Sequence, residues 1–346
     1  MKRIRVPGST ANLGPGFDVL GLALKATSTS QKFTVCLELH IEQLPEGSSV
    51  PGNCEIMCKG EGAGTFSTAC DENLVTKVAL YVLRSHGIRG FPSPVRITMV
   101  SGIPSCRGLG SSAAAVVAGV MLGNEIGHLN LSKERMFDYC LVVERHPDNV
   151  GAACYGGFIG AFMKLQAPPS EPSETLSNSL DEPPKDIASY HQFPLNTDVK
   201  MVVIIPDFHL ATTDARGRLP QNYSLEDAVF NAQRCSLLPG LLGETPLNPA
   251  KISEAMRDRL HQPYRMDLVP GFERVLQTMK HEVYPGLLGV CLSGAGPSIL
   301  ALATSNFERI AEAVCSILRE AQDIRYDWQV LEVDHDGATC CDVVMS

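Results

Sequence analysis

The segment 104–115 constrains the fold most, because a glycine-rich turn runs directly into an alanine-rich stretch. Its sequence is PSCRGLGSSAAA, and it follows alternating apolar residues at 95–99. Two glycines let a backbone approach a ligand closely, and the N–H groups and dipole at a helix start favour an anion. The pattern predicts a strand, a phosphate-binding loop and a helix. The alternative is a plain turn with an Ala-rich helix buried against a sheet.

Two widespread nucleotide motifs do not fit this segment. A Walker loop requires GxxxxGK followed by Ser or Thr, and the GxGxxG fingerprint requires a third glycine where this chain has Ala113. A P-loop NTPase and a Rossmann dehydrogenase are therefore disfavoured.

Two further glycine-rich motifs are candidate parts of a site. Residues 7–18, PGSTANLGPGFD, form a predicted loop after the first strand, and 292–298, LSGAGPS, form a predicted turn between apolar strands. Polar loops on a rigid scaffold often carry function, and such glycine turns can direct N–H groups at an anion. The alternatives are a wide structural turn and an ordinary hairpin turn.

Hydrophobic periodicity predicts a mixed α and β protein. Helical spacing or capping residues predict helices at 74–86, 111–120, 133–144 and 307–321, from 224, and near 252 and 272. Apolar or alternating runs predict strands at 1–6, 33–41, 95–99, 157–163, 201–205, 289–303 (two strands and a turn) and 329–333.

The length of 346 residues is suited to about two domains of ordinary size. We expect domains at 1–165 and 199–346, separated by a linker or surface insertion at 166–198. The first part of that segment is rich in proline, serine and acidic residues and poor in large aliphatics.

Charge and composition exclude several classes of protein. A net charge of −9 argues against a broad nucleic-acid or anionic membrane surface. No apolar run approaches the roughly 18 residues of a membrane helix. The first residues contain no signal core, so we expect a cytoplasmic protein. The twelve cysteines form no CxxC pair and are expected to be reduced, with Cys106 in the glycine loop open to oxidation.

The three glycine-rich motifs, in this order, resemble the signature motifs of the GHMP kinases, the family of galacto-, homoserine, mevalonate and phosphomevalonate kinases. The resemblance runs from residue 5 to about 302 and excludes the linker. Residues 12–21 (NLGPGFDVLG), 146–150 (HPDNV) and 262–265 (QPYR) are similar to the branch that phosphorylates L-homoserine.

The resemblance implies an α+β fold. Its parts are an N-terminal α/β domain with a left-handed βαβ crossover and a C-terminal ferredoxin-like α+β domain, with ATP between them. It also implies transfer of phosphate from ATP to the hydroxyl of L-homoserine, on the route to threonine, and a homodimer.

Homoserine carries an ammonium and a carboxylate, which call for a carboxylate and for arginine in the pocket. By resemblance, Asp18 and Asn12 hold the amino acid, and Arg216 and Arg265 bind its carboxylate. The turn at Ser293 and Gly294 closes over it. Without the family, each arginine would be read as a solvated surface charge.

The resemblance places the nucleotide on the 104–112 loop, with Asn73 at the adenine; Asn73 is also suited to cap a helix. The loop residues expected to contact the phosphates are Pro104, Arg107, Gly108, Leu109, Gly110, Ser111 and Ser112. Mg²⁺ is expected between Ser112 and Glu144, since oxygen ligands suit it. The alternative for Glu144 is an ordinary acid at a helix end.

The reaction itself does not require a strong base, because phosphoryl transfer passes through a loose transition state. We expect Asn149 to orient the substrate hydroxyl and Asp148 to support it. His146 is either a general base or, beside Pro147 at a helix end, a structural residue. The rival functions are a GHMP kinase for another small alcohol, such as mevalonate or shikimate, and a non-catalytic amino-acid or nucleotide sensor.

Overall fold

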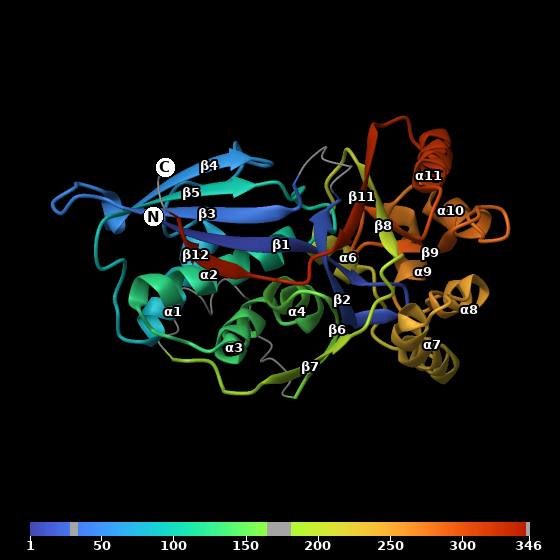
Figure 1. Cartoon of the computed structure of the whole chain (residues 1–346), viewed down its shortest axis with the longest axis horizontal. Helices are drawn as coiled ribbons and strands as arrows, with labels where there is room; N and C mark the ends of the chain where they lie inside the picture. The colour runs from blue at the N-terminus through green and yellow to red at the C-terminus, as the bar shows by residue number, and fades with distance from the viewer. Residues whose placement is uncertain (28–33, 165–180, 344–346) are drawn as a thin grey trace.

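A computed structural model describes residues 1–27, 34–164 and 181–343 (Figure 1). Its strands pair in the order β4-β5-β3-β1-β2-β11-β8-β10-β9, with β12 on β1, β6 on β2 and β7 on β6. The strands are β1 (Lys2–Asn12), β2 (Gly16–Ala26), β3 (Cys36–Gln43), β4 (Cys54–Gly60), β5 (Val95–Ser101), β6 (Phe158–Met163), β7 (Ala188–Phe193), β8 (Lys200–Pro206), β9 (Leu287–Leu292), β10 (Ile299–Ala303), β11 (Tyr326–Val333) and β12 (Thr339–Asp342).

Helices pack on the strands of both the N-terminal and the C-terminal half of the chain. They are α1 (Leu74–Ser85), α2 (Ser111–Gly127), α3 (Lys133–Glu144), α4 (Pro147–Tyr155), α6 (Thr212–Gly217), α7 (Leu225–Gly243), α8 (Pro249–Ala255), α9 (Gln262–Arg265), α10 (Phe272–Thr278) and α11 (Phe307–Ala321). In the described residues, no helix combines the length and apolarity needed to cross a bilayer.

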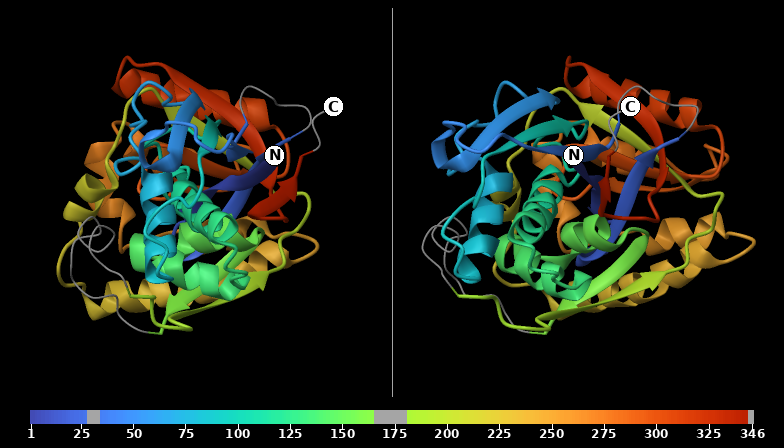
Figure 2. Two further views of the ribbon diagram at one scale, coloured as in Figure 1. Left: turned by 90° about the vertical axis from the view of Figure 1, so that its left-hand side faces the viewer. Right: turned by 60° about the vertical axis from the view of Figure 1, so that its left-hand side comes forward.

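In the N-terminal half, α1 to α4 pack together on one side of the strands (Figures 1 and 2). Strands β4 and β5 are parallel and are joined through α1. Helix α2 is apolar nearly all round and packs closely on α1, since a Cβ at Gly119 or Gly123 would lie 2.7 or 2.8 Å from Val78 or Val82 Cβ. The glycine loop therefore leads into a buried, rigid helix.

The C-terminal half has the ferredoxin-like arrangement. In chain order it runs β8, a group of helices, β9, β10, α11 and β11, and its strands pair antiparallel in the order β11-β8-β10-β9. Helix α11 buries an apolar stripe that includes Ile310, Val314 and Leu318 against this sheet. The predicted α+β fold is confirmed.

Most predicted helices occur where local signals placed them. Helices α3 and α11 have the predicted bounds, and α1 begins after Asn73, whose side chain caps it. Ser224 caps α7 by accepting the N–H of Asp227. The alternative reading of the 104–115 segment is also correct in part, because α2 is indeed buried.

Three predictions differ from the structure. The 7–18 segment is not a wide loop: β1 continues to Asn12 and β2 starts at Gly16, because both pair with other strands of the sheet. The expected linker contains β7, which pairs with β6, since apolar residues return after 186. The last residues supply β12, which pairs with β1. Residue 33, in a predicted strand, and residues 166–180, in the predicted linker, lie outside the described residues.

Candidate active site

The three glycine-rich motifs meet at Ser293, which is fully buried in the turn between β9 and β10. Its Oγ lies 2.6 Å from the carbonyl oxygen of Gly108 and 2.8 Å from Oγ1 of Thr10. The N–H of Gly294 donates to the carbonyl of Ala11 at 3.1 Å. Segments nearly 300 residues apart in sequence are thus in direct contact.

The glycine loop can adopt its path only with glycine at two positions. Gly108 and Gly110 have φ of 74° and 69°, in the left-handed region. A Cβ would lie 2.2 Å from the Ser293 carbonyl oxygen at Gly108, and 2.1 Å from Ser9 Oγ at Gly110. Because no side chain caps α2 after Gly110, its first N–H groups are available to an anion.

The remaining loop residues that were predicted to contact phosphate differ in burial and in their contacts. Leu109 is in the core, and its carbonyl accepts the N–H of Ser9 at 3.1 Å, while Pro104 is also buried. Arg107 forms an ion pair with Asp207, which follows β8, at 2.8 Å. Ser111 and Ser112 open α2. Cys106, outside the predicted contacts, is exposed, as its predicted reactivity requires.

A chain of polar contacts links α2 to α4 through the end of α3. Ser112 Oγ donates to Glu144, whose other oxygen lies 3.4 Å from His146 Nε2. His146 Nδ1 lies 2.9 Å from Asp148 Oδ1, which also accepts the Asn149 N–H at 2.7 Å. The two predicted metal ligands are therefore adjacent and are tied to the predicted catalytic pair.

These contacts set the charge of His146. Burial opposes a charged imidazole, but the Asp148 and Glu144 carboxylates outweigh burial and raise the pKa of His146 to about 9. Burial likewise opposes the Asp148 carboxylate, yet His146 and the Asn149 N–H hold its pKa below the ordinary value. At neutral pH the pair is ionised, so His146 already carries its proton.

Asp18 and Arg216 form a two-pronged ion pair, with Nη2 to Oδ1 at 2.7 Å and Nη1 to Oδ2 at 3.1 Å. Asp18 is on β2 and Arg216 on α6. The Asn12 side chain accepts the Asp18 N–H at 3.1 Å and donates to the Gly294 carbonyl at 2.9 Å. The predicted amino-acid ligands are thus together.

Arg265 is 1% exposed and packs behind this pair. Its Nε donates to the Ala215 carbonyl at 3.2 Å, and Nη1 lies 3.1 Å from His261 Nδ1. Burial, together with the nearby Arg216 charge, lowers the pKa of Arg265 to about 10. Among the described residues, no carboxylate pairs directly with Arg265. A buried guanidinium without a carboxylate favours an anionic ligand nearby.

Two predicted asparagines have part of their hydrogen-bonding capacity occupied. Asn149 Oδ1 accepts the Ser9 hydroxyl at 2.9 Å. Asn73 accepts the Val75 N–H at 3.0 Å as helix cap and donates to the Ser67 carbonyl at 2.9 Å. The capping role of Asn73 is therefore confirmed, and its contact with adenine stays a prediction.

A pocket of about 530 Å³ is lined by the starts of α1 and α2, the end of α3 and helix α6. Its lining includes Ser112, Glu144, His146, Thr212, Thr213 and Arg216, and also Leu74, Lys77, Val116, Val143 and Arg145. Sequence reasoning missed Lys77 and Arg145. Neither residue belongs to a recognisable motif, so only the tertiary structure, which brings α1 and the end of α3 to one pocket, could have revealed them.

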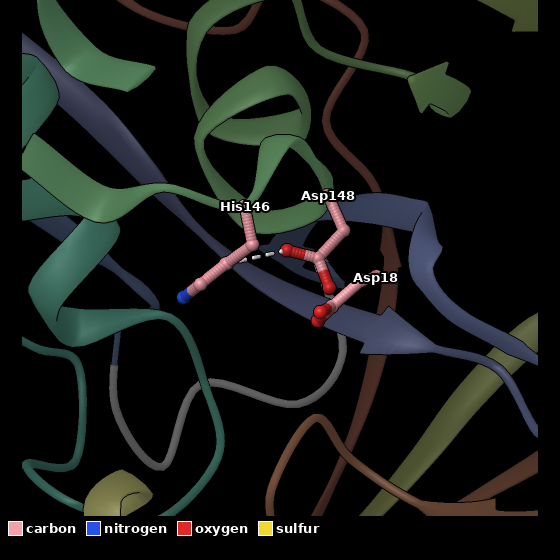
Figure 3. A group of neighbouring side chains, drawn as sticks. All are labelled: Asp18, His146 and Asp148. Atoms are coloured by element: carbon pink, nitrogen blue, oxygen red, sulfur yellow. Dashed lines mark hydrogen bonds and ion pairs between the residues drawn. The ribbon is translucent and has the colours of Figure 1, made fainter. Parts of the chain in front are cut away.

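Two groups of side chains could hold a divalent cation. Asp18, His146 and Asp148 have potential ligand atoms within 4.8 Å of one another; Figure 3 shows one Asp148 oxygen towards His146 and the other towards Asp18. However, a protonated imidazole offers no lone pair, and Asp18 already pairs with Arg216. Ser112 and Glu144 offer only oxygens beside the uncapped start of α2, which fits Mg²⁺ better.

Comparisons with known proteins agree with this geometry. Family models match at 73–157, "GHMP kinases N terminal domain", and at 245–320, "GHMP kinases C terminal". A Schizosaccharomyces pombe homoserine kinase is 43% identical, and the match covers 97% of this chain and 98% of the relative. One from Saccharomyces cerevisiae is 45% identical with the same coverage.

A solved structure has the same architecture. The crystal structure of homoserine kinase from Cytophaga hutchinsonii superimposes with a TM-score of 0.73 at 25% identity, covering 98% of this chain and 96% of the other. A mevalonate kinase structure, at 13% identity and a TM-score of 0.59, shares the fold.

Proposed function

Because the chain belongs to the homoserine kinases of the GHMP kinase family, we infer that it transfers the γ-phosphoryl group of ATP to the side-chain hydroxyl of L-homoserine. The products are ADP and O-phospho-L-homoserine. The glycine loop and the uncapped start of α2 supply a site for a phosphate chain, and the Asp18–Arg216 pair supplies a site for an amino acid. Ser112, at the start of α2, and Arg216 line the same pocket.

The observation that carries this proposal is the adjacency of Asp18 and Arg216. In an α-amino acid the ammonium and the carboxylate are attached to the same carbon, so the groups that bind them must lie side by side. Asp18 and Arg216 are in direct contact, and Arg265 supplies a second cation. Mevalonate and shikimate have a carboxylate but no ammonium, so they give Asp18 no partner.

For the transfer step, we propose that Asn149 orients the substrate hydroxyl while the glycine loop and α2 hold the terminal phosphates. Ser9 fixes the Asn149 amide oxygen, which leaves the amide N–H groups for the substrate. Ser112 and Glu144 would hold Mg²⁺, which neutralises charge on the phosphates when bound. Positioning and charge stabilisation then account for most of the rate.

Asp148 is proposed to be a supporting residue rather than a base. Its lowered pKa makes the carboxylate a weak proton acceptor, and one oxygen is already engaged by His146 and the Asn149 N–H. His146 cannot accept a proton near neutral pH, since its pKa of about 9 keeps it charged. Proton loss from the hydroxyl would therefore follow, not precede, bond formation.

The position of ATP, the oligomeric state and the cellular compartment are also proposed, on the basis of the resemblance to the family. We place ATP between domains 1–165 and 199–346, a homodimer in solution, and the protein in the cytoplasm. All cysteines are free thiols, which is compatible with a reducing compartment. Fractionation of the native cells that found the protein in another compartment would overturn the assignment to the cytoplasm.

The decisive experiment measures ADP release with Mg²⁺ and ATP against L-homoserine, D-homoserine, L-threonine, mevalonate, shikimate and galactose. Turnover should be greatest with L-homoserine. Asp18→Asn should raise KM for L-homoserine about tenfold or more, since a hydrogen bond to a charged group is worth roughly 1.5–3 kcal/mol. KM for ATP should change little.

Other results of this assay would support the rival functions. Turnover only with mevalonate, shikimate or galactose would keep the fold and the ATP site but reject the amino-acid pocket. Ligand-induced thermal stabilisation without any ADP release would instead identify a sensor.

A further inference from the structure

Arg145 adopts a backbone conformation that an arginine rarely occupies. It is the C-cap of α3, with φ of 65° and ψ of 0°, in the left-handed region where glycine is favoured. Its N–H donates to the Leu141 carbonyl at 2.8 Å, a contact that glycine would make equally well. The side chain is therefore the feature that needs an explanation.

The Arg145 side chain lines the pocket that contains Ser112 and Glu144. Lys77, the fourth residue of α1, lines the same pocket. Both side chains are partly exposed, and within the described part of the chain neither forms an ion pair. Two cations without counter-ions therefore border the space beside the uncapped start of α2.

We propose that Lys77 and Arg145 bind phosphate oxygens of ATP in the pocket that Ser112, at the start of α2, also lines. This assignment rests on the proposed function, because it takes ATP as the ligand. The polyphosphate carries several negative charges, and the glycine loop offers mainly backbone N–H groups. Arg107, the cation within the loop, is already paired with Asp207. Lys77 and Arg145 thus supply charge that the loop lacks.

The key variant is Arg145→Gly, because it separates binding from backbone conformation. Glycine suits a left-handed C-cap, so a merely structural Arg145 could be replaced without loss. If the Arg145 side chain binds phosphate, replacing it with glycine should weaken that binding. Lys77→Met retains the apolar stem in α1 and removes only the ammonium group.

A matched control is His128→Gly. His128 is the exposed C-cap of α2, also left-handed with φ of 49°, and lies about 25 Å from the start of that helix. This variant shows how much the relief of the same backbone strain changes ligand binding at a position outside the pocket.

Calorimetric titration of each protein with ATP and with adenosine tests the assignment. Arg145→Gly and Lys77→Met should each weaken ATP binding about tenfold, the effect of one hydrogen bond to a charged group, and leave adenosine binding unchanged. KM for ATP should rise in parallel, while KM for L-homoserine should stay near the wild-type value. His128→Gly should match wild type throughout.

Wild-type affinity for ATP in a variant would overturn the role of that residue. Equal losses for ATP and adenosine would do the same, since they indicate a change of pocket shape. Failure of the wild-type protein to phosphorylate L-homoserine would reject the proposed function, but the comparison of ATP with adenosine would still decide whether these cations bind phosphate.

Discussion

At the scale of single residues, the site is a set of charges that fix one another. His146 joins the predicted metal ligand Glu144 to Asp148, and Asp18 pairs with Arg216. Each group is partly or fully removed from water, where unpaired charge is costly. The polar network therefore holds its geometry before a substrate arrives.

Asp148→Asn tests whether the reaction uses a base. The amide has the same shape but cannot take up a proton, and general-base catalysis is worth roughly 10²–10⁴-fold. We expect kcat to fall by less than about tenfold, with KM values near those of wild type. Nearly complete loss of turnover with substrate binding intact would show that Asp148 is the base.

The ion pairs of His146 should make stability depend on pH. The pKa of His146 is about 9 in the folded protein, against 6.5 ordinarily, so folding favours its proton. This stabilisation is complete below about pH 6.5 and is lost as pH rises towards 9; it is worth about 3 kcal/mol at most.

The measurement is urea unfolding of wild type and His146→Gln in the presence of EDTA. The variant should be less stable at about pH 6, and the difference should shrink by about pH 9.5. A difference that stays constant across this range would reject the ionic role of His146.

At the scale of elements, one loop-to-helix junction organises the nucleotide side. Gly108 and Gly110 take left-handed conformations against Ser293 and Ser9, and α2 then starts without a side-chain cap. The first N–H groups of α2 therefore remain available to an anion.

Gly108→Ala should disrupt this junction. A left-handed alanine costs roughly 1–2 kcal/mol, and its Cβ would lie 2.2 Å from the Ser293 carbonyl oxygen. We expect a lower melting temperature and a KM for ATP raised at least about tenfold. Gly90→Ala is the control, because nothing lies within 4 Å of its Cβ and its φ is not positive. Equal behaviour of the two variants would contradict the packing argument.

At the scale of the whole molecule, the two halves of the chain share one sheet. Strand β11 pairs with β2, and β12 returns to β1, so the C-terminal residues complete the N-terminal layer. Contacts of Ser293 with Thr10 and Gly108 fasten the β9–β10 turn to the same place. The site therefore depends on both halves.

The proposed homodimer is tested by light scattering on the purified full chain. A mass of two chains, independent of protein concentration over about a tenfold range, is expected. The mass of one chain would refute the assignment.

Local signals in the sequence were sufficient for much of the fold. The period of α11, the Ser224 cap of α7 and the glycines before α2 act within a few residues, so their patterns predict the elements directly. The residue types of the three glycine-rich motifs left ordinary turns as alternatives, and it is their order, through the resemblance to the GHMP kinases, that predicts one shared site.

Only the tertiary structure decided what depends on distant partners. Strand β12 pairs with β1 from the other end of the chain, β2 pairs with β11, and β7 pairs with β6 across the expected linker. Asp18 meets Arg216 across 198 positions, and Lys77 and Arg145 come to one pocket from different helices. Such pairings leave no periodic or capping pattern, because packing rather than neighbouring sequence brings the residues together.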